Sequence, residues 1–431
     1  MYRKIMDFLE AWKENEHRKP LILQGARQVG KTYSILEFGR THYENVAYFN
    51  FETNPKLNET FEENISPDYL IPILSHIAGQ TIVREKTLIV FDEVQLCERA
   101  LTSLKYFCEN APDYHIIVAG SLLGVAVNRA KFSFPVGKVD MKTLYPMDME
   151  EFMLALGEDD LVKQIKECFQ TDTPLPSALH DAAMQLYRQY LVVGGMPECV
   201  IQFAETKDYI LVRHTQDTIL VSYLNDMSKY NNLNEIKKTR LAYDNITVQL
   251  SKKNTRFQYK LIKKGGRASE FENAIEWLCL SGIVSQVYKV EQIKKPLENY
   301  RDIDAFKIYV SDLGLLCAKK DLVANDILYM VEEINDFKGG MAENYVNVQL
   351  SINGYHTYYW ESARGAEIDF IIQRDGQLIP IEVKSADNTR AKSLKVYMDT
   401  YKPAYAIKLS ARNFGFEDNK KIVPLYAAFC I

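Results

Sequence analysis

Short uninterrupted apolar runs alternate with helical patterns along residues 20–125. Four of these runs predict buried strands, at 20–24, 46–51, 87–91 and 114–119. Between them, apolar positions recur at helical spacing, for example in 32–40 and 100–109. Buried strands that alternate with helices are typical of a parallel sheet, so we predict an α/β domain over residues 1–150.

The pattern becomes less regular after residue 125. Four prolines fall in 126–180, together with an acidic segment, 150–170, that predicts one helix. Residues 181–230 predict further helices, interrupted at the turn-forming sequence that begins at Gly194 and Gly195. We interpret 151–230 as a helical lid or linker.

Residues 231–300 carry a local positive charge, with 13 basic residues against 7 acidic ones. The stretch 251–267 holds seven basic side chains and no acid. A helix, a basic helix, a second helix and a strand hairpin indicate a winged-helix-like region that contacts DNA. A solvated helical face explains the same charge equally well.

The last part of the chain, 301–431, predicts another α/β domain. A helical pattern at 340–352 precedes three strand patterns, 356–361, 366–373 and 378–383. A further helix and strand are predicted at 391–400 and 404–409. The whole chain is therefore expected to have four parts, 1–150, 151–230, 231–300 and 301–431.

Composition narrows the class of protein. The 431 residues are 47% hydrophobic and 25% charged, which is ordinary for a globular protein. The net charge of −5 argues against a highly basic nucleic-acid coat protein. Seven scattered cysteines without a CxxC pair imply neither a zinc site nor a disulfide framework, so a reducing cytoplasm is expected. No apolar run approaches 18 residues, so we predict no membrane span. Residues 1–12 place charged side chains among apolar ones, which predicts an amphipathic helix and no secretory signal.

One segment has the residues of a phosphate-binding loop. It fits GxxxxGK[ST], follows a predicted strand and opens a predicted helix. Backbone N–H groups at a helix N-terminus bind phosphate, the lysine reaches the β- and γ-phosphates, and the threonine hydroxyl serves Mg²⁺. The predicted ATP-binding residues are Gly25, Ala26, Arg27, Gln28, Val29, Gly30, Lys31, Thr32 and Tyr33.

A second acidic segment completes this site. Asp92 and Glu93 follow a buried apolar strand, at the end where α/β sheets bind ligands. Asp92 is expected to hold Mg²⁺, and Glu93 to polarise the attacking water. Ser121 follows the next strand and either senses the γ-phosphate or serves only as a turn residue.

These residues resemble the AAA-type P-loop ATPases. Further segments, 92–95, 119–121, 135–139, 144–152 and 193–198, resemble one prokaryotic family of such ATPases fused to a C-terminal domain of unknown function (type 4143). Segments 254–267 and 308–316 resemble its C-terminal region. The family usually has arginine where this chain has Lys138, which cannot bind phosphate in a bidentate way. Arg129 or another arginine is then expected to act as the arginine finger.

The C-terminal part holds a second constellation. Asp369 lies in one predicted strand, and Glu382 and Lys384 share a face of the next, while Glu343 lies on the preceding helix. This order resembles the PD-(D/E)xK core of restriction-endonuclease-like domains. The resemblance implies metal binding by Glu343, Asp369 and Glu382 and activation of water by Lys384. A decayed nuclease fold used only for binding is the alternative.

The first functional hypothesis is a Mg²⁺-dependent ATPase that is coupled to DNA binding through 251–267 and to metal-dependent DNA cleavage. The alternative is a nucleotide-dependent signalling switch whose inactive nuclease-like domain binds a protein partner. The sequence leaves a homo-oligomer open in either case.

Overall fold

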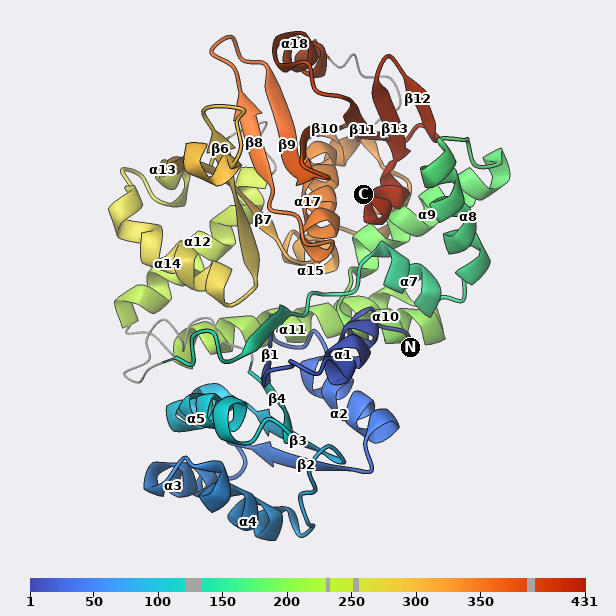
Figure 1. Ribbon diagram of the computed structural model, residues 1–431. Coiled ribbons are helices and arrows are strands. Elements are labelled where there is room, and N and C mark those ends of the chain that lie inside the picture. The colour runs from blue at the N-terminus through green and yellow to red at the C-terminus, as the bar shows by residue number, and fades with distance from the viewer. Residues whose placement is uncertain (121–133, 230–232, 251–255, 386–391) are drawn as a thin grey trace. The chain divides into compact units, whose positions relative to one another are not determined.

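The computed structural model describes residues 1–120, 134–229, 233–250, 256–385 and 392–431. Ser121, Arg129 and residues 251–255 of the basic stretch therefore lie outside the described residues. The chain divides into two compact units (Figure 1). The N-terminal unit comprises residues 2–145 with 280–282, and the C-terminal unit comprises 146–279 and 283–431 with Met1.

The N-terminal unit is built on a five-stranded parallel sheet in the order β2-β3-β4-β1-β5. Its strands are β1 (Leu21–Gln24), β2 (Asn45–Asn50), β3 (Thr87–Asp92), β4 (His115–Ala119) and β5 (Asp140–Thr143). Its helices are α1 (Ile5–Glu14), α2 (Lys31–His42), α3 (Lys56–Glu63), α4 (Pro67–Ala78), η1 (Val94–Leu96) and α5 (Glu98–Asn110). The four predicted strands and the parallel α/β architecture of this unit are confirmed.

The fifth strand, β5, has no hydrophobic pattern from which it could be predicted. Its sequence is Asp140-Met-Lys-Thr143, and none of these residues is buried. It pairs in parallel with β1, from Leu21 opposite Asp140 to Gln24 opposite Thr143. Pairing at a sheet edge, rather than burial, creates this strand.

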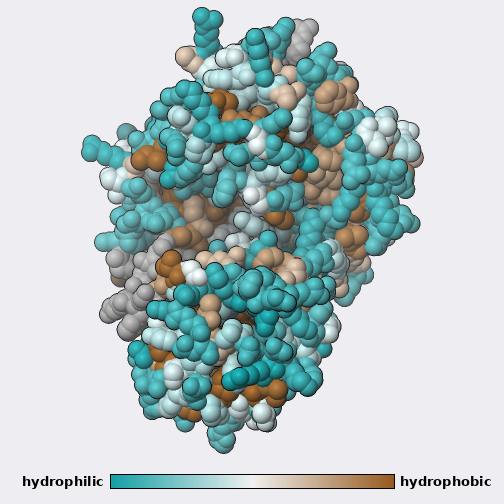
Figure 2. All heavy atoms as spheres, viewed as in Figure 1, coloured by the Kyte–Doolittle hydropathy of each residue, from teal (hydrophilic) through white to brown (hydrophobic). Residues whose placement is uncertain are grey.

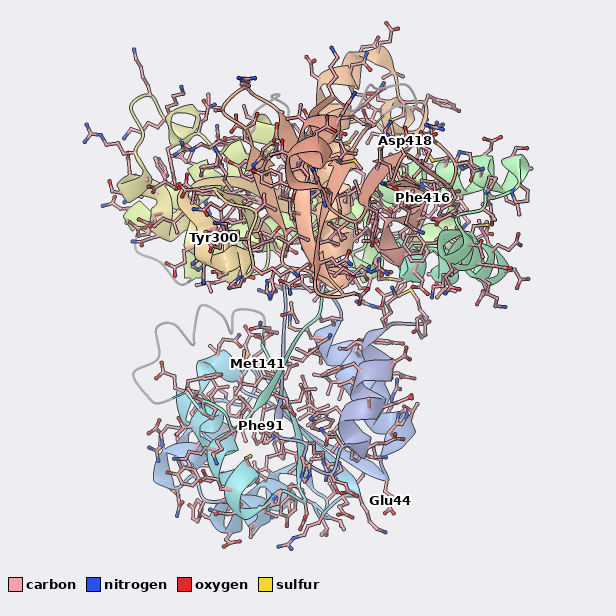
Figure 3. The ribbon with its side chains drawn as sticks, turned by 45° about the horizontal axis from the view of Figure 1, so that its top comes forward. Glu44, Phe91, Met141, Tyr300, Phe416 and Asp418 are labelled. Carbon is pink, nitrogen blue, oxygen red and sulfur yellow. The ribbon has the colours of Figure 1, made fainter. Side chains whose placement is uncertain are left out.

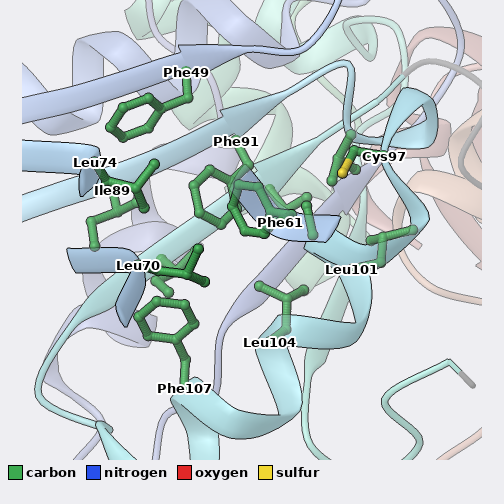
Figure 4. Packing of buried hydrophobic residues seen from close by; sticks show 14 of the residues in the cluster. Phe49, Phe61, Leu70, Leu74, Ile89, Phe91, Cys97, Leu101, Leu104 and Phe107 are labelled. Atoms are coloured by element: carbon green, nitrogen blue, oxygen red, sulfur yellow. The ribbon is translucent and has the colours of Figure 1, made fainter. Parts of the chain in front are cut away.

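An aromatic core fills the N-terminal unit. Figure 4 shows Phe49, Phe91 and Phe61 packed together, with Leu70 and Leu104 beside them. The ring centroids of Phe61 and Phe91 lie 5.5 Å apart in an edge-to-face arrangement, a favourable geometry for aromatic pairs. This core anchors β3, and so fixes the strand end at which Asp92 stands.

The helices of the C-terminal unit begin after residue 146. They are α7 (Met149–Ala155), α8 (Asp159–Thr171), α9 (Ser177–Val193), α10 (Pro197–Thr206), α11 (Tyr209–Lys229), α12 (Leu233–Leu250), α13 (Tyr259–Ile262), α14 (Ala268–Leu280), α15 (Leu313–Lys319), α16 (Ala324–Leu328), α17 (Asn335–Ile352) and α18 (Lys392–Tyr401). Short 3-10 turns are η2 (Leu297–Tyr300), η3 (Glu332–Ile334) and η4 (Leu425–Cys430). The single helix expected at 150–170 is two helices, α7 and α8, because Gly157 takes a left-handed φ of 83° between them.

An eight-stranded mixed sheet runs through the same unit in the order β12-β13-β11-β10-β9-β8-β6-β7. Its strands are β6 (Val284–Val290), β7 (Arg301–Val310), β8 (Tyr358–Glu361), β9 (Glu367–Arg374), β10 (Gln377–Val383), β11 (Ala406–Ser410), β12 (Gly415–Glu417) and β13 (Lys420–Pro424). In Figure 3, Phe416 and Asp418 mark the hairpin of β12 and β13 at one edge, and Tyr300 marks the start of β7 at the other. The boundary predicted at residue 300 falls between β6 and β7, which pair with each other in this one sheet.

The elements from α17 to β11 follow the predicted order of helix, three strands, helix and strand. Arg374 pairs with Gln377 across a two-residue turn in which Asp375 and Gly376 both have positive φ. This is the backbone that tight hairpins favour, and the predicted hairpin is confirmed. Beneath it, Trp360, Tyr397 and Leu394 form part of a buried cluster.

The basic stretch differs from the prediction. Of residues 256–267, only α13 is helical; it ends at Ile262, where Lys263 takes an extended conformation, and Gly265 follows with a φ of 79°. A basic helix is therefore not formed over the described part of the stretch, although helices α12 and α14 and the hairpin of β6 and β7 flank it.

Hydrophilic side chains predominate on the face seen in Figure 2. No helix among the described residues has the length and apolar character that crossing a membrane requires.

Candidate active site

The phosphate-loop residues lie between the end of β1 and the start of α2. Three of them, Gly25, Gln28 and Gly30, have positive φ, so the backbone curls tightly over six residues. At Gly25, where φ is 148°, a Cβ would lie 2.1 Å from the carbonyl oxygen of Leu144. Only glycine fits there, and the curl is the geometry in which successive N–H groups surround an anion.

Lys31 is the first residue of α2 and is 7% exposed. Its Nζ donates hydrogen bonds to the carbonyl oxygens of Gly25 (3.0 Å) and Ala26 (2.8 Å). The ammonium therefore lies inside the curl of the loop, in reach of any anion bound there. Within the loop, the side chains of Ala26 and Val29 are buried, whereas Tyr33, on the first turn of α2, is 63% exposed.

Asp92 brings the two halves of the site together. Its Oδ2 accepts a hydrogen bond from Thr32 Oγ1 at 2.8 Å and one from Tyr48 at 2.8 Å. Asn50 in turn donates to the Tyr48 hydroxyl at 3.1 Å. Burial, outweighing the Asn50 hydrogen bond, and the neighbouring Asp92 raise the pKa of Tyr48 to about 12, so this hydroxyl is a donor throughout the physiological pH range.

Glu93 follows Asp92 in a left-handed conformation, with φ of 52°. Its backbone N–H donates to Asp92 Oδ1 at 3.0 Å, and the side-chain amide of Gln95 donates to its carboxylate. The two carboxylates thus have different side-chain partners. Left-handed backbone in a residue other than glycine is uncommon and concentrates at functional sites.

The hydroxyl and carboxylate oxygens of Thr32 and Asp92 are ligands of the kind that Mg²⁺ prefers, and their contact places both at one point. These residues fit the predicted ion. β4 does lie beside β3, as expected, but Ser121 follows it outside the described residues. Lys138 forms an ion pair with Glu109 on α5, at 2.9 Å.

The second constellation lies in the C-terminal unit and lines a cavity of about 550 Å³. Glu343 comes from α17, Asp369 comes from β9, and Lys384 directly follows β10; all three line it. Glu382 is 3% exposed, binds Lys384 Nζ at 2.9 Å, and is not part of the lining within the described residues. Its other carboxylate oxygen is buried without a hydrogen-bond partner among those residues.

The electrostatics of this cavity are strongly perturbed. Burial, and the negative charge of Glu343, raise the pKa of Asp369 to about 7, although the N–H of Val383 donates to it at 2.7 Å. Burial lowers the pKa of Lys384, but Asp369 and Glu382 outweigh it, so the net shift is upward. Perturbed carboxyl and ammonium groups in one cavity are typical of binding and catalytic sites.

Two further residues of this cavity were not predicted from the sequence. Lys307 and Tyr309 point from β7 to Glu343, whose Oε2 lies 3.3 Å from Lys307 Nζ and 3.1 Å from the Tyr309 hydroxyl. Lys307 also pairs with Glu367 at 2.6 Å. Their spacing of two along a strand, at the start of segment 308–316, is the one signal that could have identified them.

The predicted metal set of Glu343, Asp369 and Glu382 does not fit a metal ion as these side chains stand. Within the described ranges, no three His, Cys, Asp or Glu side chains group as metal ligands. Glu343 and Glu382 already form ion pairs with the ammonium groups of Lys307 and Lys384. No reaction step is therefore derived through a metal at this cavity.

The basic stretch reaches the same cavity. Arg256 lines it and donates to the carbonyl oxygen of Asp304 at 2.7 Å. Lys263 pairs with Glu270 at 3.0 Å. Lys260, Lys264 and Arg267 are exposed.

Comparison with protein families agrees with the fold of the N-terminal unit. Residues 17–153 match an AAA domain, residues 184–326 a domain of unknown function (DUF8612), and residues 338–428 a domain of unknown function (DUF4143). The chain thus carries an AAA-type P-loop ATPase domain and a DUF4143 domain, as the sequence resemblance predicted. No curated protein matches the chain.

Solved structures include distant similarities. The Walker-type ATPase PABY2304 of Pyrococcus abyssi is 13% identical over 74% of this chain and 95% of that one, with a TM-score of 0.46. The Aeropyrum pernix ORC2 protein, in ADPNP-ADP complexes, is 12% identical over 77% and 94%, with a TM-score of 0.37. The Thermotoga maritima RuvB Holliday junction branch migration motor is 13% identical over 65% and 87%, with a TM-score of 0.29.

Proposed function

We propose that the N-terminal unit binds and hydrolyses ATP with Mg²⁺. The observation that carries this proposal is the 2.8 Å contact between Thr32 Oγ1 and Asp92 Oδ2 at the mouth of the curled loop. ATP phosphates bind to the backbone N–H groups of the loop, and Lys31 exchanges its carbonyl partners for phosphate oxygens. Glu93 orients the attacking water and accepts its proton.

Mg²⁺ bound at Thr32 and Asp92 would neutralise charge on the phosphate oxygens. The protein's own contribution is to hold the ligands and the water-orienting carboxylate apart. The left-handed backbone at Glu93 follows Asp92 directly, and Gln95 holds the Glu93 carboxylate by a hydrogen bond of its own.

The test is phosphate release from ATP by the full chain and by Glu93→Gln. We expect the variant to bind nucleotide normally and to lose about 100-fold or more of its rate, because a positioned general base contributes about 100- to 10,000-fold. Glu44→Gln is the matched control, because Glu44 lies just before β2, at the opposite end from Tyr48, and pairs with Lys86 on the surface. Hydrolysis by Glu93→Gln at the wild-type rate would overturn the assignment.

A second function is favoured by the shared lining of the C-terminal cavity. Arg256 begins the described part of the basic stretch and lines the same cavity as Asp369 and Lys384. We propose that exposed lysines of this stretch bind DNA phosphates, and that the cavity receives a phosphodiester and cleaves it or only holds it. ATP hydrolysis is coupled to this DNA binding in the proposed function.

Binding of duplex DNA at several salt concentrations tests the first part. Each phosphate contact contributes about one to the salt slope, so the double variant Lys260→Ala/Lys264→Ala should lower the slope by about two. Lys163→Ala, an exposed lysine on α8, is the control. An unchanged slope, or no binding at any salt concentration, would favour the switch that binds a protein partner.

Nicking of supercoiled plasmid tests the second part. The full chain is incubated with Mg²⁺ or Mn²⁺, with and without ATP, beside Lys384→Ala and Asp369→Asn. Nicking that is lost in both variants supports cleavage at the cavity. DNA binding without nicking leaves a site that only holds DNA.

A further inference from the structure

Lys307 is a buried ammonium group in the C-terminal cavity. Its side chain is 8% exposed, and its Nζ lies 2.6 Å from Glu367 Oε1 and 3.3 Å from Glu343 Oε2. It also lies over the ring of Tyr359, 5.3 Å from its centroid. Side chains from β8, β9 and α17 therefore surround one charge contributed by β7.

This ammonium remains charged. Burial by itself lowers the pKa of a lysine, but here Glu343, Tyr309, Glu367 and Asp369 outweigh it and raise the pKa well above the usual value. A buried cation is stable only where its partners are ionised and well placed. The ion pairs of Lys307 with Glu343 at 3.3 Å and Glu367 at 2.6 Å supply such partners.

The position of Lys307 competes with a metal ion. A divalent cation needs several carboxylate oxygens directed at one open point. Glu343 Oε2 instead accepts hydrogen bonds from the Lys307 ammonium and the Tyr309 hydroxyl. Glu367 Oε1 forms an ion pair with the same ammonium. One ammonium thus already pairs with both acids.

We propose that Lys307 is an internal counter-cation that occupies the place of a divalent ion between Glu343 and Glu367 and keeps the affinity of this cavity for metal low. A metal ion binds there only when it displaces the ammonium. Lys307 is then a positioning residue that sets the metal dependence of the cavity, and the inference rests on the phosphodiester site proposed above.

Binding of Mn²⁺ to the nucleotide-free full chain, followed by the signal of the free ion, tests this proposal. Lys307→Met should tighten binding at one site by about tenfold or more, because a like charge no longer opposes the metal. Lys307→Arg keeps the charge and should bind Mn²⁺ as the wild type does. The nucleotide site is identical in all variants, so only the cavity changes between them.

Lys289→Met is the matched control. Lys289 lies on β6 of the same sheet and pairs with Glu361 at 3.6 Å, but it does not line the cavity as described. Should Lys307→Met fail to fold, Lys307→Met/Glu367→Gln removes one charge of each sign and leaves Glu343 and Asp369 to bind Mn²⁺. Tightening of about tenfold or more is again expected.

Wild-type affinity equal to that of Lys307→Met or of the double variant would overturn the proposal, as would equal tightening in Lys289→Met. Failure of the phosphodiester proposal has a different signature, because DNA binding and nicking are then absent while the change in Mn²⁺ affinity persists.

Discussion

Thr32 Oγ1 donates a 2.8 Å hydrogen bond to Asp92 Oδ2, and so joins the first turn of α2 to the end of β3. The two strands involved, β1 and β3, are not neighbours, because β4 lies between them. The contact thus joins the carboxyl ends of two strands of one parallel sheet, the end at which α/β sheets bind ligands.

Thr32→Val removes the hydroxyl but keeps the shape of the side chain. We expect nucleotide binding without Mg²⁺ to be retained and the Mg²⁺-dependent rate of hydrolysis to fall about 10- to 100-fold. Phosphate release at increasing Mg²⁺ concentration measures this effect. Thr32→Ser keeps the hydroxyl and should stay near the wild type. Equal rates for the valine and serine variants would contradict a role for Thr32 at the ion.

Tyr48→Phe removes the second hydrogen bond to Asp92. The free energy of unfolding should fall by about 1 kcal/mol, the net value of one such bond. Urea denaturation measures it, with Tyr33→Phe as the control, because Tyr33 is largely exposed and its loss should cost less than about 0.5 kcal/mol. Equal stability of the two variants would show that the Tyr48 hydroxyl does not hold Asp92.

Gly25→Ala should be strongly destabilising. Its φ of 148° suits only glycine, and the added Cβ meets the Leu144 carbonyl oxygen at 2.1 Å. A loss of about 3 kcal/mol or more in the free energy of unfolding is expected, together with weaker nucleotide binding. Gly79→Ala is the control, because Gly79 also has positive φ but nothing lies within 4 Å of its added Cβ, and about 1 kcal/mol is expected there. Similar losses for both would mean that the loop adapts.

Asp312 predicts a pH dependence of stability. Its carboxylate accepts hydrogen bonds from the N–H groups of Gly195 (2.6 Å) and Leu315 (2.8 Å). Burial raises its pKa to about 6 despite these bonds, against an ordinary value of 3.8. Between those two values the folded state binds a proton that the unfolded state does not. This group therefore adds stability as the pH falls from about 6 to 4, and the gain is lost as the pH rises through 6.

The measurement is the free energy of unfolding of the wild type and of Asp312→Asn between pH 4.5 and 7.5. The asparagine cannot titrate, and its NH2 group faces a backbone N–H that the carboxylate accepted. The variant should therefore be less stable than the wild type at every pH, by about 2 kcal/mol. The difference between the two proteins should widen by about 1 to 2 kcal/mol on acidification. Parallel pH curves would exclude Asp312 as the titrating group.

Local patterns in the sequence are enough to predict several parts of the fold. The apolar run at 87–91 became β3, because a fully buried strand needs apolar residues on both faces. The phosphate-loop motif between β1 and α2 could be predicted because its backbone requires glycine at fixed positions. Gly25 and Gly30 both have positive φ, which glycine adopts at little cost. The hairpin at Asp375 and Gly376 follows from the same rule.

Other features depend on contacts between distant parts of the chain. The residues of β5 have no hydrophobic pattern, and only their pairing with β1 makes them a strand. Lys307 and Glu367 look like ordinary charged positions in the sequence, yet the β6–β7 hairpin joins β8 and β9 in one sheet and brings them into contact. The sequence indicates which side chains are buried and where the backbone turns. Which charge meets which depends on strand neighbours far apart in the chain, and the energy of an ion pair depends on that distance and on burial.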